Sequence, residues 1–206
     1  MRYRAILFDV DGTLTDSESL LVGSLTEAMA ELGIPCPDID LHALAMRNPK
    51  RRVLEKLGAS DVDAALECWN RRLQAKLPES KLFPGAAETV RALHGLGCTL
   101  GVVTARTGAE TDADPAMTPI APLFTVRACA EDTAEHKPHP APLLHCLGLL
   151  GVGPKDALYV GDSPTDGMAA HAAGMDFALA LWGCPPGEHI PAQINLEKPE
   201  DLLSLG

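Results

Sequence analysis

The chain has 206 residues, enough for one domain of ordinary size together with a smaller inserted one. Hydrophobic residues make up 46% of the sequence, which argues against a disordered chain. The formal net charge of −11 disfavours nucleic acid and anionic membranes as partners, because both would be repelled. For the same reason, an anionic substrate would need cationic groups at its binding site.

The cysteines and the N-terminal sequence bear on the compartment. Six cysteines are scattered among apolar neighbours, and none belongs to a Cys-x-x-Cys pair. This pattern favours buried free thiols, as in a reducing cytosol. The first apolar run is too short for a signal peptide, and no stretch approaches the length of a membrane span. We therefore expect a soluble, cytoplasmic protein.

The N-terminal part of the chain predicts one strand followed by helices. The apolar run 5–10 is closed by a turn at Gly12 and is typical of a buried parallel strand. The following segment, residues 16–82, has no convincing strand. Three stretches in it have the apolar spacing of amphipathic helices: 17–32, 49–57 and 61–77. We interpret residues 16–82 as a small helical cap domain inserted into a core formed by residues 1–15 and 83–206.

After the insertion, strands alternate with helices. Further strands are expected at residues 99–104, 157–161 and 177–181. Helices are expected at residues 86–96, 141–150 and 165–173, each followed closely by a glycine. This alternation predicts an α/β fold, a Rossmann-like core in which a parallel sheet carries helices on both faces.

Polar residues collect at the predicted strand ends, where open parallel sheets bind their ligands. These positions offer carboxylates, a hydroxyl and an ammonium: Asp9, Asp11, Thr104, Lys137, Asp162 and Asp166. Clustered carboxylates repel one another and need a cation, and hard oxygen ligands favour Mg²⁺. A carboxylate can attack phosphorus, while a metal and a lysine neutralise the charge of the transferred group. The set therefore indicates phosphoryl transfer.

Four motifs in order give the sequence a family resemblance. They are Phe-Asp-Val-Asp-Gly-Thr-Leu at 8–14, Thr104, Lys137, and Gly-Asp-Ser-Pro-Thr-Asp at 161–166. With them the sequence resembles the haloacid dehalogenase-like (HAD) hydrolases, specifically the phosphoglycolate phosphatase and β-phosphoglucomutase-like branch with a helical cap. The resemblance extends over nearly the whole chain, and four motifs in order on a fitting α/β pattern are specific.

The resemblance implies a role for each matching residue. Asp9 would be the nucleophile, and Asp11 would protonate the leaving oxygen and then activate water. Thr104 and the backbone N–H of Ala105 would bind phosphate oxygens. Lys137 would stabilise Asp9 and the phosphoryl charge.

The resemblance also implies a metal site. Mg²⁺ would be held by Asp9, the backbone carbonyl of Asp11 and Asp162, with Asp166 either binding the metal or supporting its ligands. The dehalogenases of the family lack an aspartate at the position of Asp11, so its presence disfavours dehalogenation.

The chain departs from the family pattern after the second motif. Asparagine often follows the threonine in the family, whereas Ala105 and Arg106 stand here. The family also has a helix over the region that follows. The prolines and turn formers of residues 107–119 predict that this helix is short or absent.

A basic cluster in the predicted cap consists of Arg47, Lys50, Arg51 and Arg52. One interpretation is that Arg47, Lys50 or Arg51 contacts an anionic group of the substrate and sets specificity. The alternative is a solvated helix face paired with acids such as Glu55.

We conclude that the sequence predicts a Mg²⁺-dependent phosphatase. It would hydrolyse a small phosphorylated metabolite, phosphoglycolate-like or a sugar phosphate, through an aspartyl-phosphate intermediate. Two alternatives stay open at this point: a phosphomutase of the β-phosphoglucomutase type, and a catalytically silent binding module of the same fold. The sequence does not indicate the physiological substrate or the oligomeric state.

Overall fold

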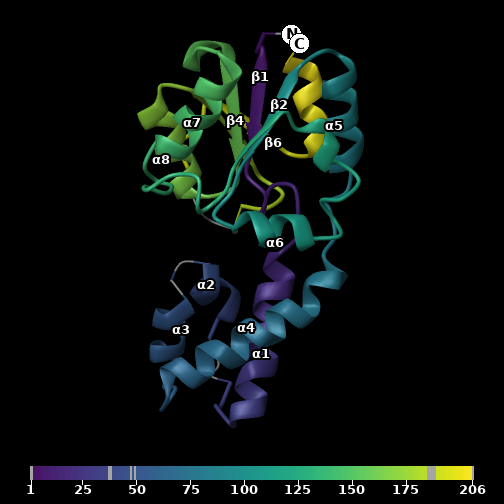
Figure 1. The fold of residues 1–206 in the computed structure, drawn as a ribbon. Helices are drawn as coiled ribbons and strands as arrows, with labels where there is room; N and C mark the ends of the chain where they lie inside the picture. Colours follow the sequence, from purple (N-terminus) through teal and green to yellow (C-terminus); the bar gives the residue numbers. More distant parts are fainter. Residues whose placement is uncertain (1, 37–38, 47, 49, 185–188, 206) are drawn as a thin grey trace. The chain divides into compact units, whose positions relative to one another are not determined.

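The computed structural model describes residues 2–36, 39–46, 48, 50–184 and 189–205 (Figure 1). The chain divides into two compact units, one formed by residues 1–16 with 81–206 and the other by residues 17–80. We call them the sheet unit and the helical unit. Within the described residues, no helix combines the length and the apolar character that crossing a bilayer would require.

The sheet unit is built on a parallel sheet of six strands in the order β3-β2-β1-β4-β5-β6. The strands are β1 Ala5–Phe8, β2 Thr99–Val103, β3 Val126–Ala128, β4 Ala157–Gly161, β5 Asp176–Ala180 and β6 Ile194–Leu196. β1 lies between β2 and β4, with Leu7 opposite both Gly101 and Tyr159. The predicted Rossmann-like α/β fold is confirmed.

Alternate residues of the four inner strands, β2, β1, β4 and β5, enter two separate hydrophobic cores. Ile6 and Phe8 of β1 face one core, whereas Ala5 and Leu7 face the other. This period of two follows from the pleat of a strand, and both faces are apolar because helices cover both.

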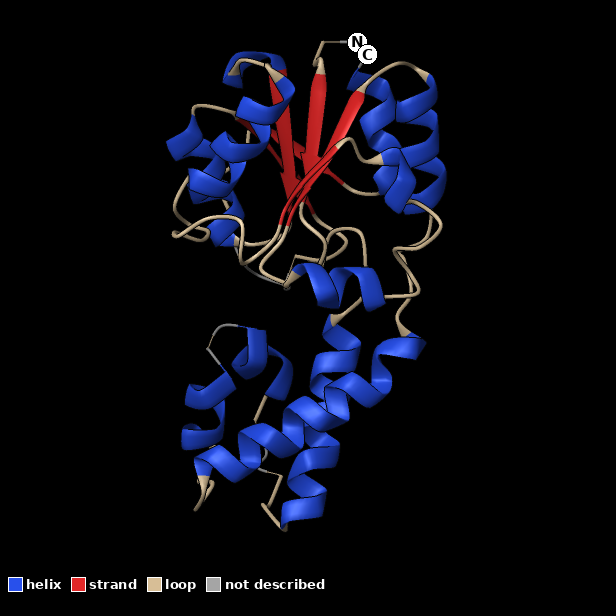
Figure 2. Cartoon of the chain, viewed as in Figure 1, coloured by secondary structure: helices blue, strands red, loops and turns tan. Residues whose placement is uncertain are grey.

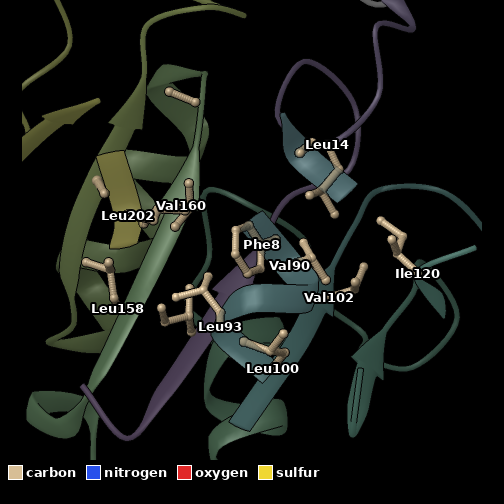
Figure 3. Packing of buried hydrophobic residues seen from close by; sticks show 14 of the residues in the cluster. Phe8, Leu14, Val90, Leu93, Leu100, Val102, Ile120, Leu158, Val160 and Leu202 are labelled. Atoms are coloured by element: carbon tan, nitrogen blue, oxygen red, sulfur yellow. The ribbon is translucent and has the colours of Figure 1, made fainter. Parts of the chain in front are cut away.

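Helices cover the two faces of the sheet in pairs, as Figure 2 shows. The first core is covered by α5 (Ala86–Gly95) and the 3₁₀ helix η4 (Pro199–Leu205), and Figure 3 shows Val90 and Leu93 beside Phe8 in this core. The second core is covered by α7 (Ala141–Leu150) and α8 (Pro164–Ala173). Removal of these apolar side chains from water is the main driving force for the layered arrangement.

The helical unit contains α1 (Glu18–Leu32), α2 (Leu41–Met46), α3 (Lys50–Lys56) and α4 (Val62–Lys76). Helix α1 packs on α4, and their interface buries Trp69 completely. The indole Nε1 of Trp69 donates to Ser24 Oγ at 3.0 Å, so its polar atom is satisfied inside the core. The three predicted helices are confirmed, whereas α2 was not predicted because six residues are too few for a periodic signal.

A short helix, α6 (Gly108–Ala113), follows β2 in the sheet unit. It begins with a capping box in which Thr107 and Glu110 satisfy each other's backbone N–H groups. It ends at Asp114, which has an extended backbone (φ −79°, ψ 111°) and precedes Pro115. A residue before proline disfavours the helical conformation, so the helix stops here. The expected shortening of this helix is confirmed.

Candidate active site

A pocket of about 180 Å³ opens at the carboxyl edge of the sheet. Its lining includes Asp9 and Asp11 from the loop after β1, Thr104 and Ala105 from the loop after β2, and Lys137 from the segment before α7. Segments far apart in the sequence thus meet at one end of the sheet unit, as expected for an open parallel sheet.

Lys137 joins two buried carboxylates at the floor of this pocket. Its Nζ lies 2.8 Å from Asp9 Oδ1 and 2.7 Å from Asp166 Oδ1. It also donates to the Tyr159 hydroxyl at 3.1 Å. Burial by itself would lower the pKa of Lys137, but the charges of Asp166 and Asp9 outweigh it and raise this pKa well above its ordinary value. Lys137 is therefore a fixed positive charge beside Asp9.

Asp166 is held by donors on both of its oxygens. Oδ1 accepts from Lys137 and, at 2.9 Å, from the Tyr159 hydroxyl. Oδ2 accepts from the backbone N–H of Ser163 at 3.1 Å and from its hydroxyl at 2.5 Å, in the capping box that begins α8. A Cβ on Gly161 would lie 2.5 Å from Asp166 Cβ, so the close approach requires glycine at that position. Asp166 thereby orients both Lys137 and the loop at Ser163.

Three carboxylates of the sheet unit form a group suited to a cation. Asp9, Asp162 and Asp166 each offer one oxygen, and these oxygens lie within 4.8 Å of one another. Asp162 also accepts from the Thr13 hydroxyl at 2.8 Å. A Cβ on Gly12, whose φ is +78°, would lie 2.3 Å from Asp162 Oδ2, so the turn after Asp11 needs glycine.

The protonation of these carboxylates reflects their crowding. Burial raises the pKa of Asp9 to about 7, with further upward contributions from Asp166 and Asp11, while Lys137 opposes the rise. Burial and then the charge of Asp9 raise the pKa of Asp162 well above its ordinary value. One lysine does not balance three buried carboxylates. Their oxygen donors therefore fit a hard divalent cation such as Mg²⁺.

The three predicted phosphate-binding residues, Thr104, Ala105 and Lys137, all line the pocket. Thr104 is buried, and its Oγ1 accepts from the backbone N–H of Arg106 at 3.1 Å. Ala105 lines the pocket next to it. The hydroxyl proton of Thr104 is thus available to a ligand oxygen, because the hydroxyl accepts from Arg106 rather than donating to it.

Comparison with known proteins decides the family. Residues 6–180 match the haloacid dehalogenase-like hydrolase family. The chain belongs to this family. A phosphoglycolate phosphatase of Xanthomonas campestris pv. campestris is 32% identical, with 98% of this chain and 96% of the relative covered. Another, of Yersinia pseudotuberculosis, is 34% identical, with 91% and 84% covered.

A solved structure agrees with this assignment. A HAD-superfamily hydrolase of subfamily IA from Geobacter sulfurreducens has a TM-score of 0.83 and 27% identity, with 99% of this chain and 96% of that chain covered. The resemblance inferred from the four motifs is confirmed. The expectation of an enzyme that is a HAD-like phosphatase is confirmed with it.

One charged residue of this HAD-like chain was not predicted to belong to the site. Arg106 donates from Nε to Asp11 Oδ2 at 2.9 Å and from Nη2 to Asp11 Oδ1 at 2.6 Å. Its Nη1 donates to Asp114 Oδ2 at 2.5 Å. In the sequence, Arg106 stood out only as a departure from the family pattern. Its contact with Asp11 could not be predicted from residue spacing, because the two residues are 95 positions apart.

The basic cluster of the helical unit is only partly described. Arg47 lies outside the described residues. Lys50 donates to Asn70 Oδ1 at 2.8 Å, and Arg51 pairs with Asp63. Both cations thus have partners on their own unit, and their assignment to substrate specificity stays a prediction.

Proposed function

We propose that this HAD-like phosphatase is Mg²⁺-dependent and hydrolyses a small phosphorylated metabolite through an aspartyl-phosphate on Asp9. The observation that carries the proposal is the buried Asp9 carboxylate at the pocket floor, in contact with the Lys137 ammonium at 2.8 Å. A nucleophilic carboxylate next to a fixed cation is what transfer of an anionic phosphoryl group requires.

Asp9 is the proposed nucleophile. An oxygen of Asp9 bonds to phosphorus while the bond from phosphorus to the leaving oxygen breaks, and this gives an aspartyl-phosphate and an alcohol. Lys137 neutralises charge on Asp9 and on the transferred group. Burial disfavours ionisation of Asp9 by raising its pKa, and the charge of Lys137 opposes this rise and favours the ionised, reactive carboxylate.

Asp11 is the proposed proton donor and acceptor. It lines the same pocket two residues after Asp9, and its side chain is 40% exposed, so it is accessible to a leaving group and to water. In the first step Asp11 gives a proton to the leaving oxygen. In the second step it takes a proton from the water that attacks phosphorus and releases phosphate from Asp9.

The remaining groups bind and orient. The Thr104 hydroxyl and the Ala105 N–H are proposed to hold phosphate oxygens at the pocket wall. Asp9, Asp162 and the Asp11 carbonyl are proposed to hold Mg²⁺, which when bound neutralises phosphoryl charge and favours in-line geometry. Asp166 is proposed to support this site, by its contact with Lys137 or as an additional ligand.

The substrate class rests on the relatives. Curated relatives with 32% and 34% identity are named phosphoglycolate phosphatases, which favours phosphoglycolate or a phosphorylated metabolite of similar size, such as a sugar phosphate. The six cysteines form no disulfide bond with one another, and this supports a reducing compartment such as the cytoplasm.

The test is phosphate release from a panel of phosphoglycolate, sugar phosphates, nucleotides, pyrophosphate and an aryl phosphate, with Mg²⁺ and with EDTA. We expect turnover that needs Mg²⁺ and is strongest for one or a few small phosphate monoesters. Equal rates in EDTA would contradict the metal assignment. A requirement for a catalytic bisphosphate with little phosphate release would favour a mutase, and no turnover of any compound would favour a silent binding module.

A further inference from the structure

We infer that Arg106 is a positioning residue that holds the carboxylate of Asp11 over the pocket, and that buried Asp114 holds Arg106 in place. This inference rests on the proposed function, because it takes from there the role of Asp11 in proton transfer. It adds two residues from outside the four motifs to the machinery of the reaction.

The contact between Arg106 and Asp11 has the geometry of a two-point clamp. Nε and Nη2 of the guanidinium each donate to a different oxygen of Asp11, at 2.9 and 2.6 Å. Paired N–H groups facing both oxygens of a carboxylate fix its position and also its rotation, which a single contact does not. The Asp11 side chain is 40% exposed and projects from a loop, so packing alone constrains it weakly. The clamp adds a constraint on both the position and the rotation of the carboxylate.

Arg106 is itself held on the opposite side. Its side chain is 11% exposed, and Nη1 donates to Asp114 Oδ2 at 2.5 Å. The side chain of Asp114 is fully buried, and its Oδ1 accepts from the backbone N–H of Ala116 at 2.9 Å. Burial by itself would lower the pKa of Arg106, but Asp11 and Asp114 raise it above its ordinary value, so the guanidinium stays charged.

The backbone around Arg106 is fixed as well. The N–H of Arg106 donates to Thr104 Oγ1 at 3.1 Å, and its carbonyl accepts from the N–H of Ala130 at 2.9 Å. The guanidinium therefore projects from a chain segment that is tied to the phosphate-binding loop. Replacement of the Arg106 side chain should disturb Asp11 more than Thr104, because Asp11 contacts the guanidinium whereas Thr104 contacts the backbone N–H.

The short helix α6 explains how Asp114 reaches Arg106. The capping box at Thr107 begins the helix directly after Arg106, and Pro115 ends it at Asp114. The chain then turns back with the carboxylate of Asp114 beside the guanidinium, eight residues along the sequence. The proline that ends this helix thus follows directly on Asp114, the residue that holds Arg106.

Positioning matters because proton transfer needs close approach. A general acid or base contributes about 10²- to 10⁴-fold when it lies within hydrogen-bond reach of the proton that moves. Loss of the clamp would leave the Asp11 carboxylate in the chain but remove the two contacts from Arg106 that fix its rotation. The loss should therefore appear only where the reaction depends on Asp11.

The experiment compares Arg106→Gln, Arg106→Lys and Asp114→Asn with the wild type on two substrates. One is an alkyl phosphate such as phosphoglycolate, whose leaving oxygen needs a proton. The other is p-nitrophenyl phosphate, whose leaving group departs without one. The matched control is Arg127→Gln, because Arg127 forms an exposed ion pair with Asp112 of α6, with side chains 49% and 65% exposed.

We expect Arg106→Gln to lower kcat/KM for the alkyl phosphate at least about tenfold and to change that for p-nitrophenyl phosphate by less than about threefold. Asp114→Asn should act in the same direction with a smaller loss. Arg106→Lys keeps the charge without the paired donors and should fall between the wild type and the glutamine variant. The control should match the wild type on both substrates.

Two results would overturn the inference. One is an equal loss on both substrates, and the other is no loss relative to Arg127→Gln. Circular dichroism and thermal unfolding show whether Arg106→Gln folds. If it does not, Arg106→Lys and Asp114→Asn test the inference by the same comparison of kcat/KM for the alkyl phosphate and for p-nitrophenyl phosphate. Failure of the proposed function itself is distinct, because then the wild type and the control would also turn over neither substrate.

Discussion

Two groups of charged residues, one in each unit, lie in very different environments. In the sheet unit, the side chains of Lys137, Asp9 and Asp166 are at most 10% exposed, and Lys137 and Asp166 each contact more than one partner. In the helical unit, Arg51 and Asp63 form an ion pair whose side chains are 53% and 80% exposed. A basic side chain paired with aspartate is thus buried and has several contacts in the sheet unit, whereas it is exposed to solvent in the helical unit.

This difference indicates which charged residues affect the stability of the fold. An exposed ion pair contributes about 0–1 kcal/mol, because water screens it and two long side chains lose freedom. A buried ion pair that loses one partner costs about 3–5 kcal/mol, because the remaining charge is left uncompensated. A buried group of like charges is therefore maintained at a cost in stability, and such groups are typical of functional sites.

The largest expected effect is on activity. Asp9→Asn removes the attacking carboxylate with little change in shape, and turnover should fall at least about 10⁴-fold. The measurement is phosphate release, with far-UV circular dichroism to show that the fold is retained. Asp112→Asn, which changes an exposed aspartate of the same unit, is the control and should keep wild-type activity. Substantial turnover by Asp9→Asn would refute the assignment of the nucleophile.

The next effect concerns stability at the buried cluster. Lys137→Met leaves Asp9 and Asp166 without their shared cation, and the free energy of unfolding should fall by about 3 kcal/mol in EDTA. Urea unfolding measures it. Lys155→Met is the matched control, since Lys155 is exposed, and it should change stability by less than about 0.5 kcal/mol. If both variants changed the free energy of unfolding equally, the buried charge would contribute no more to stability than the exposed one, which would contradict the prediction.

The same cluster predicts a pH dependence of the metal-free protein. At a pH below 3.8, the ordinary pKa of an aspartate, Asp9 is protonated in both the folded and the unfolded state. As the pH rises from there to about 7, only the unfolded state releases the proton, so Asp9 destabilises the fold progressively, by at most about 4 kcal/mol. Asp162 acts with the same sign, because its pKa is also raised.

Urea unfolding in EDTA between about pH 4 and pH 8 tests this dependence. As the pH rises, the wild type should become progressively less stable than Asp9→Asn, so the difference between their free energies of unfolding should increase. Added Mg²⁺ should reduce the difference by stabilising the wild type. A difference that does not change with pH would show that burial does not perturb Asp9 as described.

The smallest effect is expected in the helical unit. Arg51→Gln should leave the free energy of unfolding almost unchanged, because the pair with Asp63 is exposed and water screens it. Steady-state kinetics with the preferred substrate then tests the specificity prediction. A raised KM at unchanged stability would support a substrate contact, and an unchanged KM would indicate a solvated pair. Arg52→Gln, which removes the exposed pair with Glu55, serves as the control.

Much of the sheet unit was readable from the sequence because its signals are local. Buried parallel strands are continuous apolar runs, and the run at residues 157–161 matches β4 in both bounds. The carboxylates follow these strands directly, so their meeting at one edge follows from the topology of a parallel sheet. The glycines at 12 and 161 also belong to the motifs, and each is needed where an aspartate approaches the backbone.

Other features depended on tertiary structure. Strands β3 and β6 have three residues each, too few for a periodic signal, and they form only because neighbouring strands supply hydrogen-bond partners. The clamp on Asp11 likewise joins Arg106 to a residue 95 positions away, and no propensity or spacing encodes such a contact. The sequence therefore specified which groups carry the chemistry, because motifs and strand ends are local. The packing of distant segments decided how those groups are held, because burial and ion pairing arise only once the chain has folded.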